Sequence, residues 1–355
     1  SRRAERVRDA QEHVQDDLAA RLLELGLIAV LLLAPLPFGA VGPRGRGALE
    51  WVALGLGLVW WLAAMRRGMA PRTGPLLVGT LLLLGLATLQ LVPLGPVADA
   101  ISPNAAAMRA GEVAPERALA AETHLLGRDP AAAAQAGTLS LDPGATGSAL
   151  LTGIALALLM LVAVDVAARR GVRRLALALL VSGSFQGLYG LLVLISGHDH
   201  IWYRAKPAYL DSATGTFINR NHFACFLAMS LACGMALILA NAARRPPRRG
   251  SRLAALLGAD GSRDLILALL LAVGAAGLFA SFSRAGIVLG LAALLVTVLL
   301  GARFLGLRTR AWIAVSIVAV SLVPLLSIGP RRLVERFAES HESLMQAGGR
   351  ARVWL

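Results

Sequence analysis

The composition of this chain of 355 residues excludes most soluble folds. Hydrophobic residues make up 57% of it, charged residues only 16%, and the mean hydropathy is +0.67. A soluble domain of this size could not bury so much apolar side chain. The formal net charge is +14, and every basic residue except Lys206 is an arginine. We interpret this excess as a signal of membrane topology, and we predict no nucleic-acid partner.

Nine apolar runs predict an all-α fold, a polytopic membrane helical bundle of about nine transmembrane helices. Each run approaches the ~20 residues that an α-helix needs to cross a ~30 Å hydrocarbon core. The runs lie at residues 22–41, 48–65, 74–92, 148–167, 175–196, 221–240, 265–280, 286–302 and 311–328.

The distribution of arginine predicts which way the helices run. With a cytoplasmic N-terminus, 21 of the 35 basic residues lie in cytoplasmic segments and 14 lie on the opposite side. The outer side also holds 12 of the 21 acidic residues, so the two sides carry net charges of +12 and +2. Because positive charge resists translocation, we predict a multi-pass protein with a cytoplasmic N-terminus.

The same pattern divides the chain into segments. Residues 1–21 form a cytoplasmic N-terminal segment, and residues 22–328 form the transmembrane domain, which includes a long outer loop at 93–147. Residues 329–355 begin a second large outer loop. Because the chain starts at Ser1 and stops inside this loop, we expect a fragment that is cut off before further C-terminal helices.

Three segments on the outer side carry residues that are suited to binding an anion. They are Gly215–Ala224 (GTFINRNHFA), Ser281–Gly286 (SFSRAG) and Gly349–Trp354 (GRARVW). The first two lie at the starts of apolar runs that are predicted to run inward. The third lies in the large loop near the end of the chain.

The starts of these two inward helices predict a site for a multiply charged anion. A helix start leaves backbone N–H groups free and carries the positive end of the helix dipole. Asn219 or Asn221 and Ser283 are suitable N-cap residues, and Arg220 and Arg284 lie beside them. Arginine can hold phosphate oxygens bidentately, so phosphate is the first candidate. The alternative is that both arginines only mark the membrane interface by snorkelling.

These motifs together resemble a known family. GTFINRNHFACFL at residues 215–227, then SFSRAG and then GRARVW in a large outer loop, are similar to the O-antigen ligase and polymerase superfamily of bacterial inner-membrane proteins. The resemblance covers residues 140–355. PLPFG at 35–39 and LSLDPGAT at 139–146 are similar to short patterns of these proteins, although either could be an ordinary turn.

The resemblance implies a metal-independent glycosyltransferase without a cofactor. Such a protein transfers a glycan from an undecaprenyl-pyrophosphate carrier to an acceptor at a periplasmic active site, in lipopolysaccharide or polysaccharide biosynthesis. The acceptor is lipid A-core, a growing polysaccharide chain or a protein. Arg284 matches the turn arginine of the family and Arg350 its loop arginine, and both would hold the pyrophosphate. Arg220 is the third residue that we expect to bind the pyrophosphate. Supporting candidates are Ser283, Asn219, Asn221, His222, Arg204 and, if the loop register differs by two, Arg352.

The general base is the part of the family pattern that this chain lacks. The catalytic histidine of the family is usually followed by Asn and lies further along the large loop. No such pair occurs between Arg350 and Leu355, so we expect the base after Leu355. His341 precedes the loop arginine, and His222 lies beside the predicted pocket; these two are the alternatives within the chain.

Other charged residues on the outer side have two interpretations. His198–His200 resembles half of a metal site, but a lone His-x-His lacks further ligands, so we interpret it as a solvated loop. Arg204 and Lys206 either attract the anionic substrate or are simple interfacial charges.

The predicted partners are an undecaprenyl-pyrophosphate-linked glycan, its acceptor and membrane lipids. A rival hypothesis is a permease or flippase for a lipid-linked or anionic solute, in which the outer arginines bind cargo and no bond is made. A third is a structural scaffold, which only the lack of charged residues at the midpoints of the runs favours.

Overall fold

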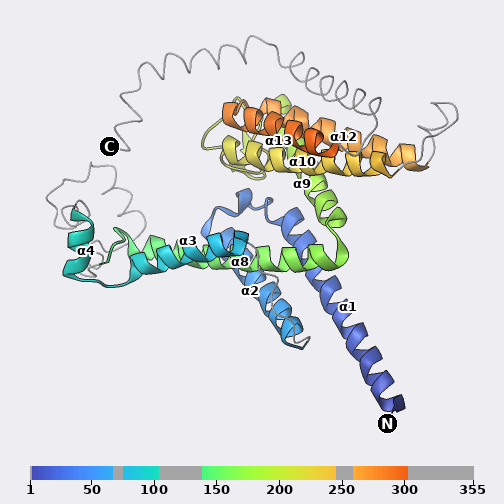
Figure 1. The fold of residues 1–355 in the computed structure, drawn as a ribbon. Coiled ribbons are helices and arrows are strands. Elements are labelled where there is room, and N and C mark those ends of the chain that lie inside the picture. The colour runs from blue at the N-terminus through green and yellow to red at the C-terminus, as the bar shows by residue number, and fades with distance from the viewer. Residues whose placement is uncertain (1, 67–74, 104–137, 245–258, 303–355) are drawn as a thin grey trace. The chain divides into compact units, whose positions relative to one another are not determined.

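The computed structural model describes residues 2–66, 75–103, 138–244 and 259–302 (Figure 1). Their regular secondary structure is helical, apart from one short hairpin. The elements in chain order are α1 (Arg2–Leu33), the 3-10 turn η1 (Phe38–Ala40), α2 (Pro43–Arg66), α3 (Pro75–Leu91), α4 (Pro96–Ile101), α8 (Pro143–Arg170), α9 (Arg173–Ser196), the strands β1 (His200–Ile201) and β2 (Arg204–Ala205), α10 (Arg220–Ala243), α12 (Ala259–Ala280) and α13 (Arg284–Ala302).

Six of the described helices are long and apolar enough to cross a membrane. They contain the candidate spans Pro43–Arg66, Pro143–Arg170, Arg173–Ser196, Arg220–Ala243, Ser262–Ala280 and Arg284–Gly301. A chain with six such helices is a multi-pass membrane protein. The prediction of an all-α membrane fold is therefore confirmed at this level.

The first predicted run, 22–41, does not form one helix. α1 ends at Leu33, and the chain then turns through Pro35 and Pro37 into η1. Proline lacks an N–H donor and disfavours helical backbone at the residue before it, so two prolines one residue apart end the helix. The apolar run continues past the break because the turn itself carries apolar residues.

Two further runs differ from the prediction in other ways. The run at 74–92 is helical as α3, but its apolar stretch Leu76–Leu91 is shorter than the six candidate spans. The run at 311–328 lies outside the described residues, and so does most of the loop 93–147, of which the structure describes α4 and the segment that leads into α8.

Prolines set the starts of the helices in the first half of the chain. Pro43, Pro75, Pro96 and Pro143 are the first residues of α2, α3, α4 and α8. Proline suits this position because its N–H would be unbonded there in any case. At α8, Asp142 Oδ1 also accepts a hydrogen bond of 2.8 Å from the backbone N–H of Ala145. The LDPG sequence at 141–144 is therefore an ordinary helix start.

The contacts divide the chain into two compact units. The first comprises residues 1–23 and 46–169, and the second comprises residues 24–45 and 170–355. In the first unit, Gly57 of α2 lies against Leu158 of α8. Glu50 of α2 accepts a hydrogen bond of 2.5 Å from Thr152 Oγ1 of α8, which satisfies a polar pair between two apolar helices.

The second unit is a bundle of α9, α10, α12 and α13 (Figure 1). α10 and α13 run in the same direction, because Gly286 lies against Ala224 near their starts and Gly301 lies against Leu239 near their ends. α9 runs antiparallel to α10, since its first residue, Arg173, donates a hydrogen bond to Asn241 near the end of α10. The starts of α10 and α13 therefore lie at one end of this bundle.

Close backbone contact holds α9 against α12. A Cβ atom added to Gly277 of α12 would lie 2.6 Å from Cα of Gly187 in α9. Ser184 Oγ of α9 donates a hydrogen bond of 2.8 Å to the carbonyl of Leu270 in the same contact. Small residues that allow backbones to approach are a common basis of helix packing in membranes.

An ion-pair cluster fixes the part of α1 that belongs to this second unit. Glu24, which is buried, pairs with Arg170 and with Arg174, the latter at 3.0 Å. The sequence pattern places both arginines among the basic residues of the predicted cytoplasmic segments. They also neutralise a buried carboxylate, which would otherwise be costly to place in the protein interior.

Candidate anion site at the starts of α10 and α13

The start of α10 is built by Asn219. Its backbone is extended, with φ −101° and ψ 120°, and its side chain accepts a hydrogen bond of 2.8 Å from the backbone N–H of Asn221. This is the geometry of an N-cap, in which a side-chain oxygen replaces the missing carbonyl of a preceding turn. The structure thus selects Asn219 over Asn221 as the cap.

The start of α13 is built by Ser283. Its Oγ accepts a hydrogen bond of 3.2 Å from the backbone N–H of Gly286, three residues further on. Its own backbone N–H donates 3.1 Å to Oγ of Ser281. Phe282 between them has φ +50°, a rare conformation for a bulky residue, and it is buried. The turn between α12 and α13 is therefore tight and held by two serine side chains.

The two helix starts touch through a side-chain hydrogen bond. Ser283 Oγ donates to Asn221 Oδ1 at a distance of 2.8 Å. Since α10 and α13 run in the same direction, the positive ends of both helix dipoles lie side by side here. Two motifs that are sixty-two positions apart in the sequence thus form one polar surface.

An arginine occupies the first position of each helix. Arg220 at the start of α10 lies with its guanidinium 5.0 Å from the ring centroid of Tyr209, a cation–π distance. Arg284 at the start of α13 is partly exposed, and no described residue forms a hydrogen bond or ion pair with it. Arg220 is thus oriented by an aromatic ring, while Arg284 has no hydrogen-bond or ion-pair partner among the residues that the structure describes.

The segment 206–217 forms the support of this surface and is buried at Lys206 and from residue 212 to residue 217. The backbone N–H of Ala213 donates 2.8 Å to the carbonyl of Ala280 at the end of α12. The backbone N–H of Thr216 donates 2.8 Å to Oε1 of Gln186 in α9, and the Thr216 hydroxyl lies 3.0 Å from the same oxygen. These bonds tie the approach to α10 to the helices around it.

Lys206 belongs to this support rather than to the exposed surface. Its side chain is buried, and Nζ donates to the carbonyls of Tyr209 and Ser212 at 3.2 and 2.9 Å. Burial lowers the pKa of the Lys206 ammonium below its ordinary value. Lys206 therefore orders the loop, and of the two outer cations predicted together only Arg204 faces outward.

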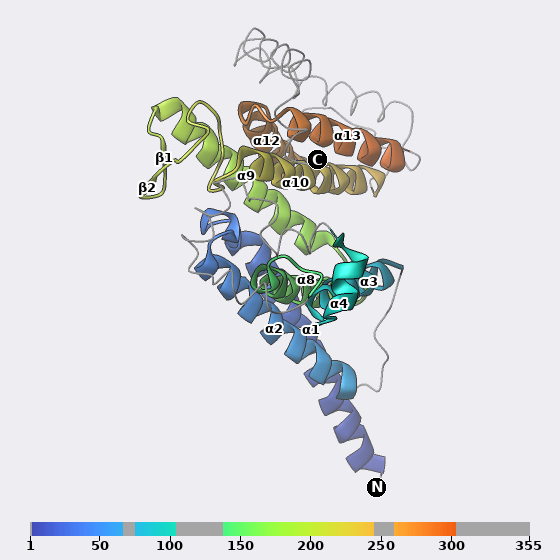
Figure 2. The same ribbon diagram turned by 90° about the vertical axis from the view of Figure 1, so that its left-hand side faces the viewer.

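Arg204 lies on the hairpin of β1 and β2, near the end of α9 in Figure 2. Its guanidinium lies 5.4 Å from the ring centroid of Phe38 and 5.8 Å from that of Tyr203. The hairpin is held to the turn after α1, because Trp202 Nε1 donates 3.0 Å to the carbonyl of Leu36. Arg204 is thus positioned by two aromatic rings.

The turn PLPFG at 35–39 contacts the GTF segment directly. Thr216 Oγ1 donates 2.6 Å to the carbonyl of Pro35. Gly39 has φ +71°, and a Cβ atom there would lie 2.6 Å from Phe217 Cδ1, so only glycine fits. Two short motifs that the sequence presented separately therefore form one buried contact.

The histidines of the described residues do not gather into a metal site. His222 is exposed on the first turn of α10, and His198 Nδ1 contacts the carbonyl of Ser196 at 2.9 Å. No group of three or more His, Cys, Asp or Glu side chains suited to a metal occurs in the parts of the chain that are described. His341, Arg350 and Arg352 lie outside those parts, so their predicted roles stay predictions.

Gln186 is the residue that sequence reasoning missed. It is fully buried in the middle of α9, and its Oε1 accepts a hydrogen bond of 2.8 Å from the backbone N–H of Thr216. An amide inside an apolar run was the available signal, because such a group requires a partner. Because glutamine is neutral, Gln186 does not stand out among the charged residues of the chain.

Comparisons of the chain with protein-family models, with curated proteins and with solved structures find no match.

Proposed function

We propose that the protein is a membrane glycosyltransferase that moves a glycan from an undecaprenyl-pyrophosphate carrier to an acceptor. The observation that supports this most is the contact between the starts of α10 and α13, joined by Ser283 and Asn221. Each start carries an N-cap side chain and an arginine at the first helical position. This arrangement is chemically suited to a group with several negative charges, such as pyrophosphate.

The chemistry follows from the leaving group. In such a transfer the bond between the glycan and pyrophosphate breaks, and the acceptor oxygen or nitrogen forms a new bond to the same sugar carbon. Negative charge grows on the pyrophosphate as it leaves. Arg284, Arg220 and the free N–H groups of the two helix starts would stabilise this charge, and such preorganised donors commonly lower a barrier by several kcal/mol, about 10²–10³ in rate for one donor.

We also propose which membrane the protein spans and how it is oriented in that membrane. The family resemblance places it in the bacterial inner membrane, with the starts of α10 and α13 on the periplasmic side and the N-terminus in the cytoplasm. We further propose that the protein has about nine membrane spans. Arg350 of the large loop would be a second arginine that binds the pyrophosphate. No residue of this chain is assigned as the general base.

A reconstitution experiment tests the proposal. The full-length protein in proteoliposomes receives a labelled undecaprenyl-pyrophosphate glycan together with lipid A-core, polysaccharide or peptide acceptors. We expect the label to appear covalently on one acceptor, with release of undecaprenyl pyrophosphate. The control is protein-free liposomes with the same components.

The rival permease hypothesis predicts another outcome of the same experiment. The labelled glycan would then cross the bilayer still attached to its carrier, and no acceptor would become labelled. Movement without a new bond would therefore overturn the proposed transferase activity. A labelled glycan that neither crosses the bilayer nor becomes attached to an acceptor would overturn both hypotheses.

A further inference from the structure

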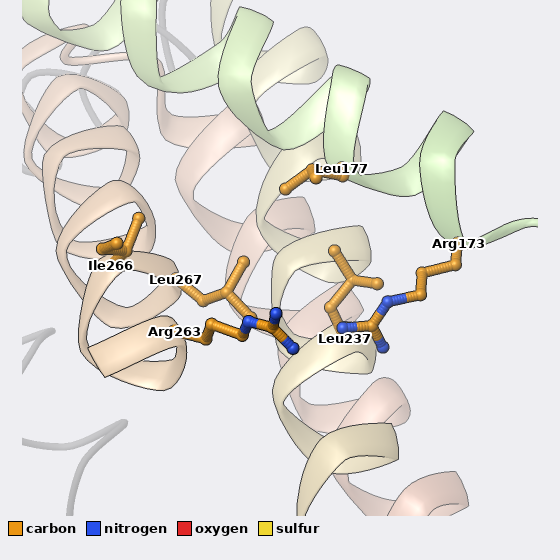
Figure 3. Close-up of a pocket in the computed structure, with 6 residues that line it drawn as sticks. All are labelled: Arg173, Leu177, Leu237, Arg263, Ile266 and Leu267. Atoms are coloured by element: carbon orange, nitrogen blue, oxygen red, sulfur yellow. The ribbon is translucent and has the colours of Figure 1, made fainter. Parts of the chain in front are cut away.

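A cavity of about 330 Å³ lies at the opposite end of the second unit from the candidate anion site. Its wall is formed by the first turns of α9, the last part of α10 and the beginning of α12 (Figure 3). The lining residues are Arg173, Leu177, Leu237, Arg263, Ile266 and Leu267. α9 separates the two sites by its own length, about 36 Å for an α-helix of this size.

The rim of this cavity carries an excess of positive charge. The side chains of Arg173 and Arg263 extend toward Leu237 from two different helices (Figure 3). Asn241 Oδ1 accepts a hydrogen bond of 2.8 Å from Nη1 of Arg173, and Asn241 Nδ2 donates 2.9 Å to Oδ1 of Asp264. Among the side chains described at this rim, two arginines accompany the single carboxylate of Asp264, so the rim attracts an anion.

The start of α9 adds to this attraction for an anion. Its N-cap is Val172, whose side chain cannot accept a hydrogen bond, so the first N–H groups of the helix have no side-chain cap. They lie beside Arg173, the first residue of the helix. The positive end of the α9 dipole and a guanidinium thus coincide at the rim.

Below the charged rim the cavity is apolar and reaches the surface of the helices. Leu237 and Leu267 are buried, while Leu177 is 42% exposed and Ile266 is 58% exposed. In a membrane-spanning bundle such exposed side chains face lipid tails. The wall therefore continues from the cationic rim to the hydrocarbon without a polar interruption among the lining residues.

We infer that this cavity binds an anionic phospholipid, with its phosphate between Arg173 and Arg263 and an acyl chain along Leu177, Leu237 and Ile266. The combination of two arginines with an apolar wall is complementary to a lipid with a charged headgroup, rather than to a free anion or a neutral lipid. The arginine-rich end of the bundle is also the end that the sequence predicts to be cytoplasmic, where the headgroup region would lie level with the rim. The inference does not depend on the proposed transferase activity.

The test compares two lipids that share the same acyl chains. Delipidated full-length protein is given phosphatidylglycerol or phosphatidylcholine, and bound lipid is counted by native mass spectrometry. We expect phosphatidylglycerol to be retained at least about fivefold better. The double variant Arg173→Gln/Arg263→Gln should lose this preference and retain the two lipids about equally. Arg66→Gln, at the exposed end of α2, is the matched control and should keep it.

Two further experiments distinguish a bound phospholipid from a free phosphate group. Leu177→Trp fills the apolar wall without a change of charge and should weaken retention of phosphatidylglycerol. Soluble glycerol phosphate at millimolar concentration should not displace the lipid, because it lacks the acyl chain. Equal retention of the two lipids by the wild-type protein, an undiminished preference in a folded double variant, or displacement by glycerol phosphate would each overturn the inference. If the double variant does not fold, the wild-type lipid ratio and the competition arm decide.

Discussion

At the scale of single residues, Ser283 holds the candidate site together. Its Oγ accepts from the N–H of Gly286 and donates to Asn221, so it both caps α13 and joins α13 to α10. Ser283→Ala should therefore destabilise the protein by about 1–3 kcal/mol, through loss of a cap and of a buried hydrogen bond. The midpoint of thermal unfolding in detergent measures this. Ser196→Ala, which removes an exposed hydroxyl at the end of α9, is the matched control and should change little.

Lys206 gives a prediction for the dependence of stability on pH. Because burial lowers its pKa in the folded protein, the unfolded chain binds more protons at alkaline pH than the folded chain does. The contribution of Lys206 to the free energy of unfolding should thus rise with pH between its lowered pKa and its ordinary value of 10.5. Chemical unfolding of the wild type and of Lys206→Met from pH 7 to pH 10 checks this. A difference between them that stays constant or falls with pH would contradict the burial argument.

Residue types at helix starts could be predicted from the sequence, but their partners could not. The sequence predicts Asn219 or Asn221 as one cap and Ser283 as the other, because Asn and Ser favour that position. The bond between Ser283 and Asn221 depends on the parallel packing of α10 and α13, which no local pattern encodes. The burial of Lys206 could not be predicted either, since nothing in its neighbourhood indicated that two loop carbonyls would bind its ammonium group.

At the scale of elements, the contact between α9 and α12 depends on glycine. A methyl group on Gly277 would meet the backbone of Gly187, which cannot move as a side chain can. Gly277→Ala should destabilise the protein by about 1–3 kcal/mol, or force the helices apart. Gly85→Ala in α3, where a Cβ would meet nothing within 4 Å, is the control and should be neutral or stabilising by up to ~1 kcal/mol. Thermal unfolding of both variants in the same detergent makes the comparison.

Hydropathy predicts the boundaries of those helices that begin and end close to the ends of an apolar run. The run at 221–240 corresponds to α10, which extends it by three residues at its end. The prediction of one helix over residues 22–41 was wrong because hydropathy does not detect a break in the backbone. Pro35 and Pro37 were the signal for that break. The hairpin of β1 and β2 was not predicted, since strands of two residues leave no periodic pattern.

At the scale of the whole molecule, the arginine count predicts which ends of the helices face the cytoplasm. In a variant without Cys225 and Cys233, a cysteine at Tyr203 in the hairpin should react with a membrane-impermeant maleimide added to intact cells. A cysteine at Arg244, exposed just after α10, should react only after the membrane is opened. The reverse pattern would mean that the charge count misleads and that the candidate anion site faces the cytoplasm.

The central claim is that the joined starts of α10 and α13 hold the pyrophosphate of a lipid-linked glycan, with Arg284 as a direct ligand. The measurement that tests it most directly is the initial rate of glycan transfer in proteoliposomes by the wild type, Arg284→Ala and Arg284→Lys, with Arg66→Ala as the control. We predict a loss of at least about hundredfold for Arg284→Ala and a clear loss for Arg284→Lys, which keeps the charge but not the planar fork, while Arg66→Ala stays at the wild-type rate. Transfer by Arg284→Ala at the wild-type rate would contradict the claim.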